Sequence, residues 1–158
     1  MSPDFAVEAR GVEYAYRNRK GVHPALAGLS FQVAPGEIYG FLGPNGGGKT
    51  TLFRILATLA RPQGGAVSIF GMQDSMAIRR LLGVVFQNPS LDVHLTVREN
   101  LLHQGHLYGV SGKDLERRIG AALERFGLAE RREQKAAELS GGLRRRVEIG
   151  RASCRERV

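Results

Sequence analysis

"GPNGGGKT", residues 43–50, is the segment that most constrains the fold of this chain. It fits the pattern G-x-x-x-x-G-K-[S/T] at every specified position. Before it runs the apolar stretch Ile38–Leu42, which we interpret as a short buried parallel strand. After it, residues 51–59 carry leucine and isoleucine at helical spacing. A glycine-rich loop in this context predicts a phosphate-binding loop rather than a turn with a chance lysine.

The residue types of this loop suit a nucleoside triphosphate. Glycines let successive backbone N–H groups turn toward one anion, and the positive end of the following helix points at the same place. We expect Lys49 to reach the β- and γ-phosphates, the Thr50 hydroxyl to hold Mg²⁺, and Thr51 to offer its N–H and hydroxyl to the α-phosphate. The residues predicted to contact the nucleotide are Gly43, Pro44, Asn45, Gly46, Gly47, Gly48, Lys49, Thr50 and Thr51.

Length and composition indicate a globular domain with a core, since the chain has 158 residues of which 42% are apolar. No apolar run is long enough to cross a bilayer and no secretory signal is visible, so we expect a soluble cytoplasmic protein. The net charge is +8, but residues 144–158 hold six arginines against two glutamates. We interpret this as a basic tail, and no nucleic-acid partner is expected. Cys154 is the single cysteine, which excludes a disulfide framework.

Hydrophobic periodicity predicts a strand-rich front and a helical second half. The expected strands, besides Ile38–Leu42, cover residues 5–16, 26–33, 66–70 and 82–86, with a short helix at 74–81. Thr96 and Glu99 form a predicted capping box that opens a helix running to about Tyr108. A second helix is expected at 113–126, closed by Gly127, and Ser140 opens a third.

The segment Leu139-Ser140-Gly141-Gly142, followed by Leu143 and an arginine-rich helix, resembles the signature motif of ATP-binding-cassette (ABC) ATPases. The order of parts is also similar: an aromatic near the first strand, the phosphate loop, a glutamine after a later strand, a helical subdomain, then the signature. The resemblance covers residues 5–148. It implies an α/β P-loop NTPase fold, with a parallel-sheet core, an antiparallel β subdomain and a helical subdomain. Residues 1–148 would be a partial nucleotide-binding domain, with the Q-loop and helical subdomain at about 87–148.

The resemblance also implies roles for residues outside the loop. Two domains of this family pair head to tail, so Ser140, Gly141 and Gly142 are expected to face the γ-phosphate held by a second copy. Leu143 stands where the family most often has glutamine, at the periphery of this turn. Gln87 matches the Q-loop glutamine, which approaches Mg²⁺ and the attacking water, so Gln87 is a predicted catalytic and metal-contacting residue. The alternative for Gln87 is a polar residue that ends a strand.

Two of three further features have competing interpretations. Tyr16 is predicted to stack on adenine, with Tyr14 as the alternative, although an aromatic at a strand end is often a core residue. Residues 88–95 would link to the helical subdomain, where the membrane partner of the family docks. His103 and His106 share a spacing that suits a metal, but without a third ligand an exposed helix face is expected instead.

The hydrolytic carboxylates of the family are not found in this sequence. In the family an apolar strand ends in Asp followed by Glu, and here no run of four apolar residues leads into such a pair. We expect a domain truncated before this Walker B strand and catalytically incompetent alone. Residues 149–158, IGRASCRERV, correspond codon for codon to a sequencing-adapter sequence followed by a stop. We therefore expect residues 149–158 to be a non-native tail; the alternative is a genuine basic helix.

The function implied by the resemblance is that of an ATP-binding subunit, hydrolysing ATP when complete, that powers an ABC transporter. The stretch at residues 83–92 and the leucine in the signature look most like the drug- and polysaccharide-exporter branch. Expected partners are a second nucleotide-binding domain and membrane-spanning permease subunits, at the inner face of the cell membrane. One alternative is a soluble ABC ATPase acting on DNA or ribosomes. A P-loop kinase or GTPase is a remote alternative, because it has no use for residues 139–142.

Overall fold

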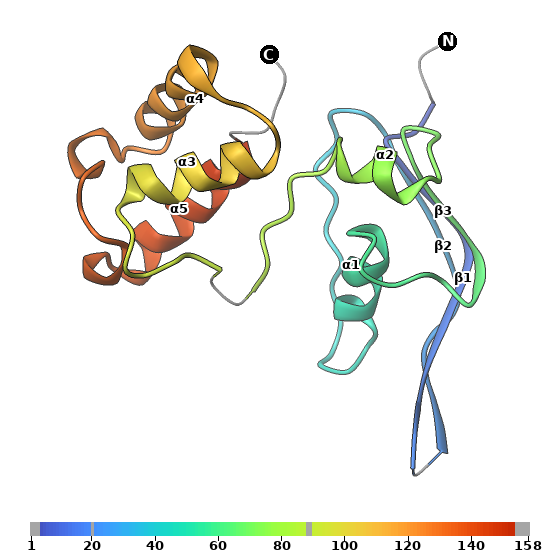
Figure 1. Cartoon of the computed structure of the whole chain (residues 1–158). Coiled ribbons are helices and arrows are strands. Elements are labelled where there is room, and N and C mark those ends of the chain that lie inside the picture. Colours follow the sequence, from blue (N-terminus) through green and yellow to red (C-terminus); the bar gives the residue numbers. More distant parts are fainter. Residues whose placement is uncertain (1–3, 20, 88–89, 154–158) are drawn as a thin grey trace. The chain divides into compact units, whose positions relative to one another are not determined.

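The structure of this chain is a computed structural model that describes residues 4–19, 21–87 and 90–153. It divides into two compact units, Met1–Leu82 and Gly83–Val158. Figure 1 shows strands together with helices in the first unit and a set of packed helices in the second. Among the described residues, no helix is long and apolar enough to cross a membrane.

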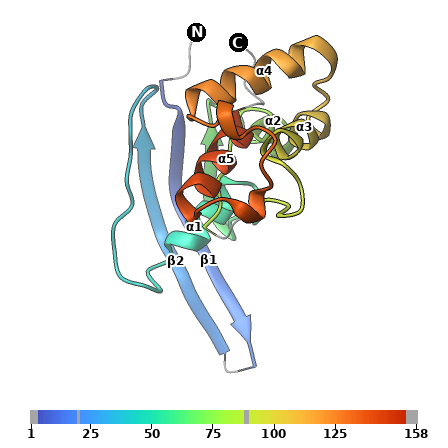
Figure 2. The same ribbon diagram turned by 90° about the vertical axis from the view of Figure 1, so that its left-hand side faces the viewer.

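The first unit contains an antiparallel sheet with the strand order β2-β1-β3. Its strands are β1 (Val7–Asn18), β2 (Gly21–Val33) and β3 (Gly64–Ile69). The β1–β2 pairing continues to Asn18 opposite Gly21, beyond the point where β3 stops, and forms the long hairpin seen in Figure 2. The three predicted strands of this region are confirmed, but β2 begins earlier than expected. Its Pro24 is tolerated because β2 is an edge strand with a register irregularity beside Ala15.

Helix α1 (Lys49–Leu56) supplies the core of the first unit together with the sheet. Its Ile55 packs against Ala9 and Val12 of β1, and all three side chains are buried. Half-buried apolar residues surround them: Tyr14, Leu26, Leu29, Phe31, Ala60 and Val67. A shorter helix, α2 (Ser75–Arg79), begins where the Asp74 carboxylate accepts a hydrogen bond from the Ala77 N–H at 2.7 Å. The packing of α1 on the sheet fixes where its N-terminus lies.

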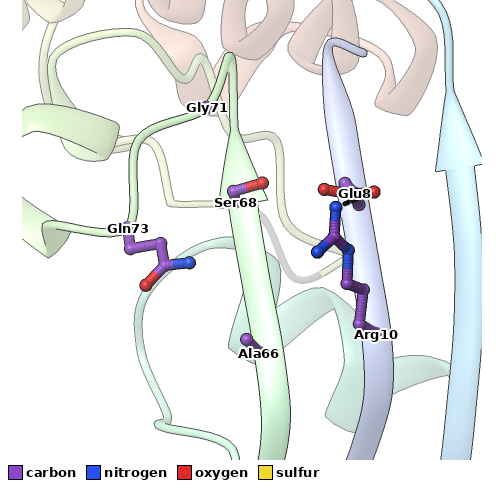
Figure 3. Close-up of a pocket in the computed structure, with 6 residues that line it drawn as sticks. All are labelled: Glu8, Arg10, Ala66, Ser68, Gly71 and Gln73. Carbon is purple, nitrogen blue, oxygen red and sulfur yellow. Dashed lines mark ion pairs between the residues drawn. The ribbon is translucent and has the colours of Figure 1, made fainter. Parts of the chain in front are cut away.

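A pocket lies along β1 and β3, and Figure 3 shows an ion pair between two of its lining residues on β1. Its lining residues are Glu8, Arg10, Ala66, Ser68, Gly71 and Gln73. Glu8 accepts a hydrogen bond from the Gln32 side chain at 2.7 Å and pairs with Arg10 at 2.9 Å. The Gln32 hydrogen bond and then Arg10 lower the pKa of Glu8. A carboxylate that stays charged and is already satisfied makes this pocket unsuited to a triphosphate.

The two strands predicted at Ile38–Leu42 and at residues 82–86 are not formed, and those predictions are wrong for this structure. Ile38 and Leu42 are 100% and 98% exposed, although their sequence is that of a buried strand. A strand forms only where the backbone of a neighbouring strand hydrogen-bonds to it. Within the described residues, the sheet is antiparallel and neither segment joins it. The expected antiparallel β part is therefore observed, whereas the parallel part is not.

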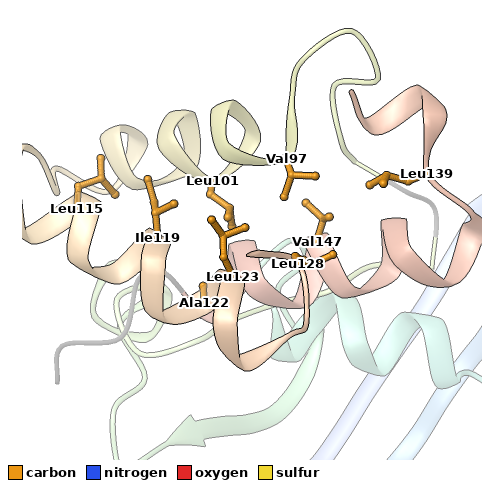
Figure 4. Packing of buried hydrophobic residues seen from close by; sticks show 9 residues of the cluster. All are labelled: Val97, Leu101, Leu115, Ile119, Ala122, Leu123, Leu128, Leu139 and Val147. Atoms are coloured by element: carbon orange, nitrogen blue, oxygen red, sulfur yellow. The ribbon is translucent and has the colours of Figure 1, made fainter. Parts of the chain in front are cut away.

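The second unit is built from α3 (Val97–Leu107), α4 (Gly112–Arg125) and α5 (Gly141–Ser153). Two short 3-10 turns, Ala129–Arg131 and Ala136–Glu138, connect α4 to α5. All three predicted helices are confirmed. Their inward faces form one apolar core, drawn in Figure 4, which contains Val97, Leu101, Leu115, Ile119, Ala122, Leu123, Leu128, Leu139 and Val147.

The predicted capping box at the start of α3 is also confirmed. Thr96 Oγ1 accepts from the Glu99 N–H at 3.1 Å, and the Glu99 carboxylate accepts from the Thr96 N–H at 2.7 Å. The hydrogen bond from the Thr96 backbone N–H to the carboxylate, and after it the Thr96 side chain, lower the pKa of Glu99. The predicted end of α4 is confirmed as well. Gly127, which follows this helix, adopts a φ of 64°, a left-handed conformation that ends a helix.

Candidate nucleotide-binding site

The glycine-rich segment forms the loop that leads into α1, with Gly48 as the residue just before the helix. The Gly47 N–H donates to the Pro44 carbonyl at 3.2 Å, which closes a turn inside the loop. Residues 43–47 are exposed. The first turn of α1 has no acidic side chain, so nothing there opposes an anion at the positive end of the helix dipole. The loop and the helix together therefore present a free anion-binding end.

Gly48 is required at its position for two reasons. Its φ of 80° lies in the left-handed region, and an added Cβ would lie 2.2 Å from the Ala25 carbonyl oxygen of β2. The loop is thus pressed against the sheet at this residue. The neighbouring Gly47 has no such φ, and its Cβ would lie 3.1 Å from the Pro44 oxygen.

Lys49 lies across the loop that it follows. Its ammonium group donates hydrogen bonds to the Gly43 and Pro44 carbonyls, each at 2.7 Å. These bonds keep a positive charge at the loop, and they are bonds that phosphate oxygens are able to replace. The geometry therefore suits the predicted role of Lys49 toward a phosphate.

Tyr16 and Thr51 meet beside the loop. The two hydroxyl groups are 3.1 Å apart, so Tyr16 on β1 is tied to the second residue after Lys49. Tyr16 is 41% exposed, whereas Tyr14 is half-buried and packs against the core, with its ring 5.1 Å from that of Tyr16. Of the two tyrosines, Tyr16 is the more exposed. The Thr51 hydroxyl is buried and engaged, which leaves its N–H as the group expected to serve a phosphate.

The donor set suits Mg²⁺ held mostly by phosphate and water. Thr50 is exposed in the first turn of α1 and Gln87 is exposed in the second unit, and both carry neutral oxygen donors. Within the described ranges, no group of three or more His, Cys, Asp or Glu residues gathers to hold a metal, including around His103 and His106. Mg²⁺ commonly retains waters and takes only one or two protein ligands beside substrate phosphates. Thr50 and Gln87 each offer an oxygen donor of the kind that such an ion takes.

Ser140, Gly141 and Gly142 form an exposed turn at the start of α5. The Ser140 carbonyl accepts from the Arg144 N–H at 2.9 Å, and its hydroxyl accepts from the Leu143 N–H at 3.4 Å. Leu139 is buried, and Leu143 packs against the same core, so leucine at position 143 serves the packing of α5. The turn is thereby fixed while its backbone N–H groups stay accessible.

The predicted site residues fall into two sets, one in each unit. The first unit brings together the loop, Lys49, Thr50, Thr51 and Tyr16; the second carries Gln87 and residues 140–142. A side chain that the sequence did not single out is Glu148, which is buried in α5 and bonded to the segment that follows Gln87. Its signal was available: a glutamate three residues after Arg145 in an otherwise basic helix.

Comparison with known proteins places these features in a family. The family described as "ABC transporter" matches residues 26–157. The chain is 38% identical over 149 residues to the daunorubicin resistance ATP-binding protein DrrA3 of Streptomyces coeruleorubidus, covering 92% of this chain and 46% of that protein. It is 39% identical over 153 residues to the Nod factor export ATP-binding protein I of Paraburkholderia xenovorans, covering 95% and 49%. The chain thus spans about half the length of the curated relatives it matches.

Solved structures agree with the sequence relatives. cbiO1 from Clostridium perfringens, part of the ABC transporter complex cbiONQ, has a TM-score of 0.84 and 27% identity, covering 96% of this chain and 62% of its own. A dimeric ATP-binding cassette in a post-hydrolysis state, bound to ADP and Pi, has a TM-score of 0.80 and 28% identity, covering 94% and 69%. The predicted P-loop NTPase fold class is therefore confirmed. With its phosphate loop and signature in the family's order, this chain belongs to the ABC transporter family of ATP-binding proteins.

Proposed function

We propose that this chain is the ATP-binding portion of a subunit that powers an exporter of the ABC family. The observation that carries the proposal is the exposed loop at the start of α1, with Lys49 folded over it and no acidic residue in the first helical turn. The names of the relatives, which are drug-resistance and Nod factor export proteins, favour export. They favour it over a soluble ABC ATPase acting on DNA or ribosomes.

At the loop, the backbone N–H groups and Lys49 bind the phosphates. Phosphate oxygens replace the Gly43 and Pro44 carbonyls as acceptors for the Lys49 ammonium group. Tyr16 packs its exposed ring on adenine, while its hydroxyl stays bonded to Thr51. Thr50 and Gln87 would hold Mg²⁺, which when bound would neutralise charge on the terminal phosphates.

The second half of the proposed site comes from another copy. Ser140, Gly141 and Gly142 present an N-terminal helix end, which would meet the far side of a triphosphate bound to a partner's loop. The dimeric state of the solved cassette supports carrying this arrangement over to the present chain. We also propose that the complete subunit attaches to permease subunits at the inner face of the membrane, which the match to the ABC transporter family supports.

Hydrolysis is assigned to the complete subunit rather than to this chain alone. Gln87 would orient the attacking water, but the carboxylates that the family uses to position Mg²⁺ and polarise water are not among these residues. We expect the chain alone to bind ATP with Mg²⁺ only weakly and to turn it over at a negligible rate.

A titration of the 158-residue chain with a fluorescent, non-hydrolysable ATP analogue and Mg²⁺ tests the proposal. Lys49→Ala is expected to weaken binding at least tenfold, because it removes a charge-assisted contact worth roughly 1.5–3 kcal/mol. Lys113→Ala removes the same charge from an exposed site in α4 and should leave affinity unchanged. Equal affinity of the Lys49→Ala variant and the unaltered chain would overturn the assignment of the loop.

A further inference from the structure

The buried carboxylate of Glu148 connects α5 to the segment that follows Gln87. Glu148 is 6% exposed, although it lies in a helix rich in arginine. Its Oε1 accepts a hydrogen bond from the Ser90 N–H at 2.7 Å, and its Oε2 lies 3.1 Å from Nη1 of Arg145. A buried charge costs free energy unless it is paired and hydrogen-bonded, and here both oxygens are engaged.

Arg145 extends this connection to the residue before Gln87. Its Nη1 also donates to the Phe86 carbonyl, so the same guanidinium contacts the Glu148 carboxylate and the backbone at position 86. Gln87 therefore lies between two backbone groups that α5 binds, the Phe86 carbonyl and the Ser90 N–H. Arg151 also reaches Ser90, at 2.8 and 2.6 Å, but it lies within residues 149–158, which we expect to be non-native. Only Glu148 and Arg145 are assigned a role.

The helix that makes these contacts is the one that begins at the signature turn. Glu148 lies about two turns beyond Ser140 on α5. The helix is anchored by Leu139 and Val147, both buried in the core of the second unit. A displacement of the Ser140 turn that moves α5 would therefore also move the backbone on either side of Gln87.

We propose that Glu148 and Arg145 are positioning residues, which hold Phe86 and Ser90, and with Phe86 its neighbour Gln87, at a fixed place relative to the Ser140–Gly142 turn. They act through Gln87 and do not touch nucleotide. This inference rests on the proposed function, since Gln87 and the turn matter together only if both serve ATP. A neutral or apolar residue would fill the space of Glu148 in the helix, but it would not bind both the Ser90 N–H and Arg145.

Hydrogen exchange in the 158-residue chain tests the contact directly. In Glu148→Ala the Ser90 amide should exchange about tenfold faster, since its acceptor is gone. Glu148→Gln should give a smaller increase, because a neutral carbonyl oxygen remains. The Asp92 amide, which donates to Asn100 Oδ1 at 3.0 Å, is an internal reference that should not change. Wild-type exchange at Ser90 in both variants would overturn the proposal; if the alanine variant unfolds, the glutamine variant decides.

Steady-state kinetics of the complete ATPase subunit test the consequence. Glu148→Ala should lower kcat about tenfold with KM for ATP within about twofold, because the phosphate loop belongs to the other unit. Arg146→Ala, which removes a charge from an exposed position of α5, should change neither constant. A purely structural role for Glu148 would lower the amount of folded protein and leave kcat per nucleotide-binding subunit unchanged, which contradicts the proposal.

The two proposals fail in different ways. If Lys49→Ala retains nucleotide binding, the proposed function fails whatever happens at Ser90. If Lys49→Ala abolishes binding while Glu148→Ala leaves both the Ser90 exchange rate and kcat at wild-type values, only the positioning role fails.

Discussion

The Tyr16 and Thr51 hydroxyl groups lie 3.1 Å apart, which ties the exposed aromatic of β1 to the helix that begins at the phosphate loop. The bond joins residues from a strand and a helix that are far apart in the sequence. It gives the proposed adenine-stacking ring a fixed place beside the proposed phosphate site. The hydroxyl and the ring of Tyr16 thus have different roles, and two different substitutions can test them separately.

Tyr16→Phe removes the hydroxyl and keeps the ring. We expect a loss of about 1 kcal/mol in the free energy of unfolding of the first unit, and nucleotide affinity within about threefold of wild type. Tyr16→Ala should weaken binding further, because the stacking surface is gone. Thermal denaturation and a nucleotide titration measure the two effects. Wild-type affinity in Tyr16→Ala would show that the ring does not contact adenine.

Two adjacent glycines should respond differently to alanine. At Gly48 a Cβ would lie 2.2 Å from the Ala25 oxygen and φ is 80°, so Gly48→Ala should destabilise the first unit by about 2 kcal/mol or more. At Gly47 the nearest atom is 3.1 Å away, so Gly47→Ala should cost less than about 1 kcal/mol. Urea denaturation of both variants measures the difference. Equal losses in the free energy of unfolding of the two variants would mean that Gly48 is not in close contact with β2.

The core of the second unit offers a matched pair on α3. Leu101 is 1% exposed, so Leu101→Ala should lower the free energy of unfolding by roughly 2–5 kcal/mol. Leu107, on the same helix, is 80% exposed, and Leu107→Ala should change it by less than about 0.5 kcal/mol. Chemical denaturation followed by far-UV circular dichroism compares them. A large effect at Leu107 would place that residue inside a packed interface instead.

Acid should weaken the capping box of α3. The Thr96 hydrogen bonds lower the pKa of Glu99 below its ordinary value of 4.5. The stability that Glu99 contributes is therefore complete above pH 4.5 and is lost as the pH falls through the lower folded-state value. The melting temperature of wild type should fall across this range more steeply than that of Glu99→Gln. Parallel curves for the two proteins would contradict a role for the charged carboxylate.

Local sequence signals predicted those parts of the fold that local chemistry determines. The capping box at Thr96, the end of α4 at Gly127 and the start of α5 after Ser140 all follow from hydrogen bonds within a few residues. The strand at Ile38–Leu42 was predicted wrongly because its formation depends on neighbours, and apolar sequence alone does not supply them.

In the candidate site too, features set by local sequence were predictable and contacts between distant residues were not. The positions of Lys49 and Gly48 follow from the loop pattern, since a phosphate loop must turn into a helix there. The contacts of Tyr16 with Thr51 and of Glu148 with Ser90 join residues 35 and 58 positions apart, so only the folded chain reveals them. Their residue types were visible, but their partners were not.

The exposed side chains of Ile38 and Leu42 affect the solubility of the isolated polypeptide. Two fully exposed aliphatic side chains on a segment outside the sheet favour self-association, and salting-out anions such as sulfate strengthen that tendency. Dynamic light scattering should therefore report particles that grow with protein concentration and with sulfate, and replacing both residues by threonine should keep the polypeptide dispersed.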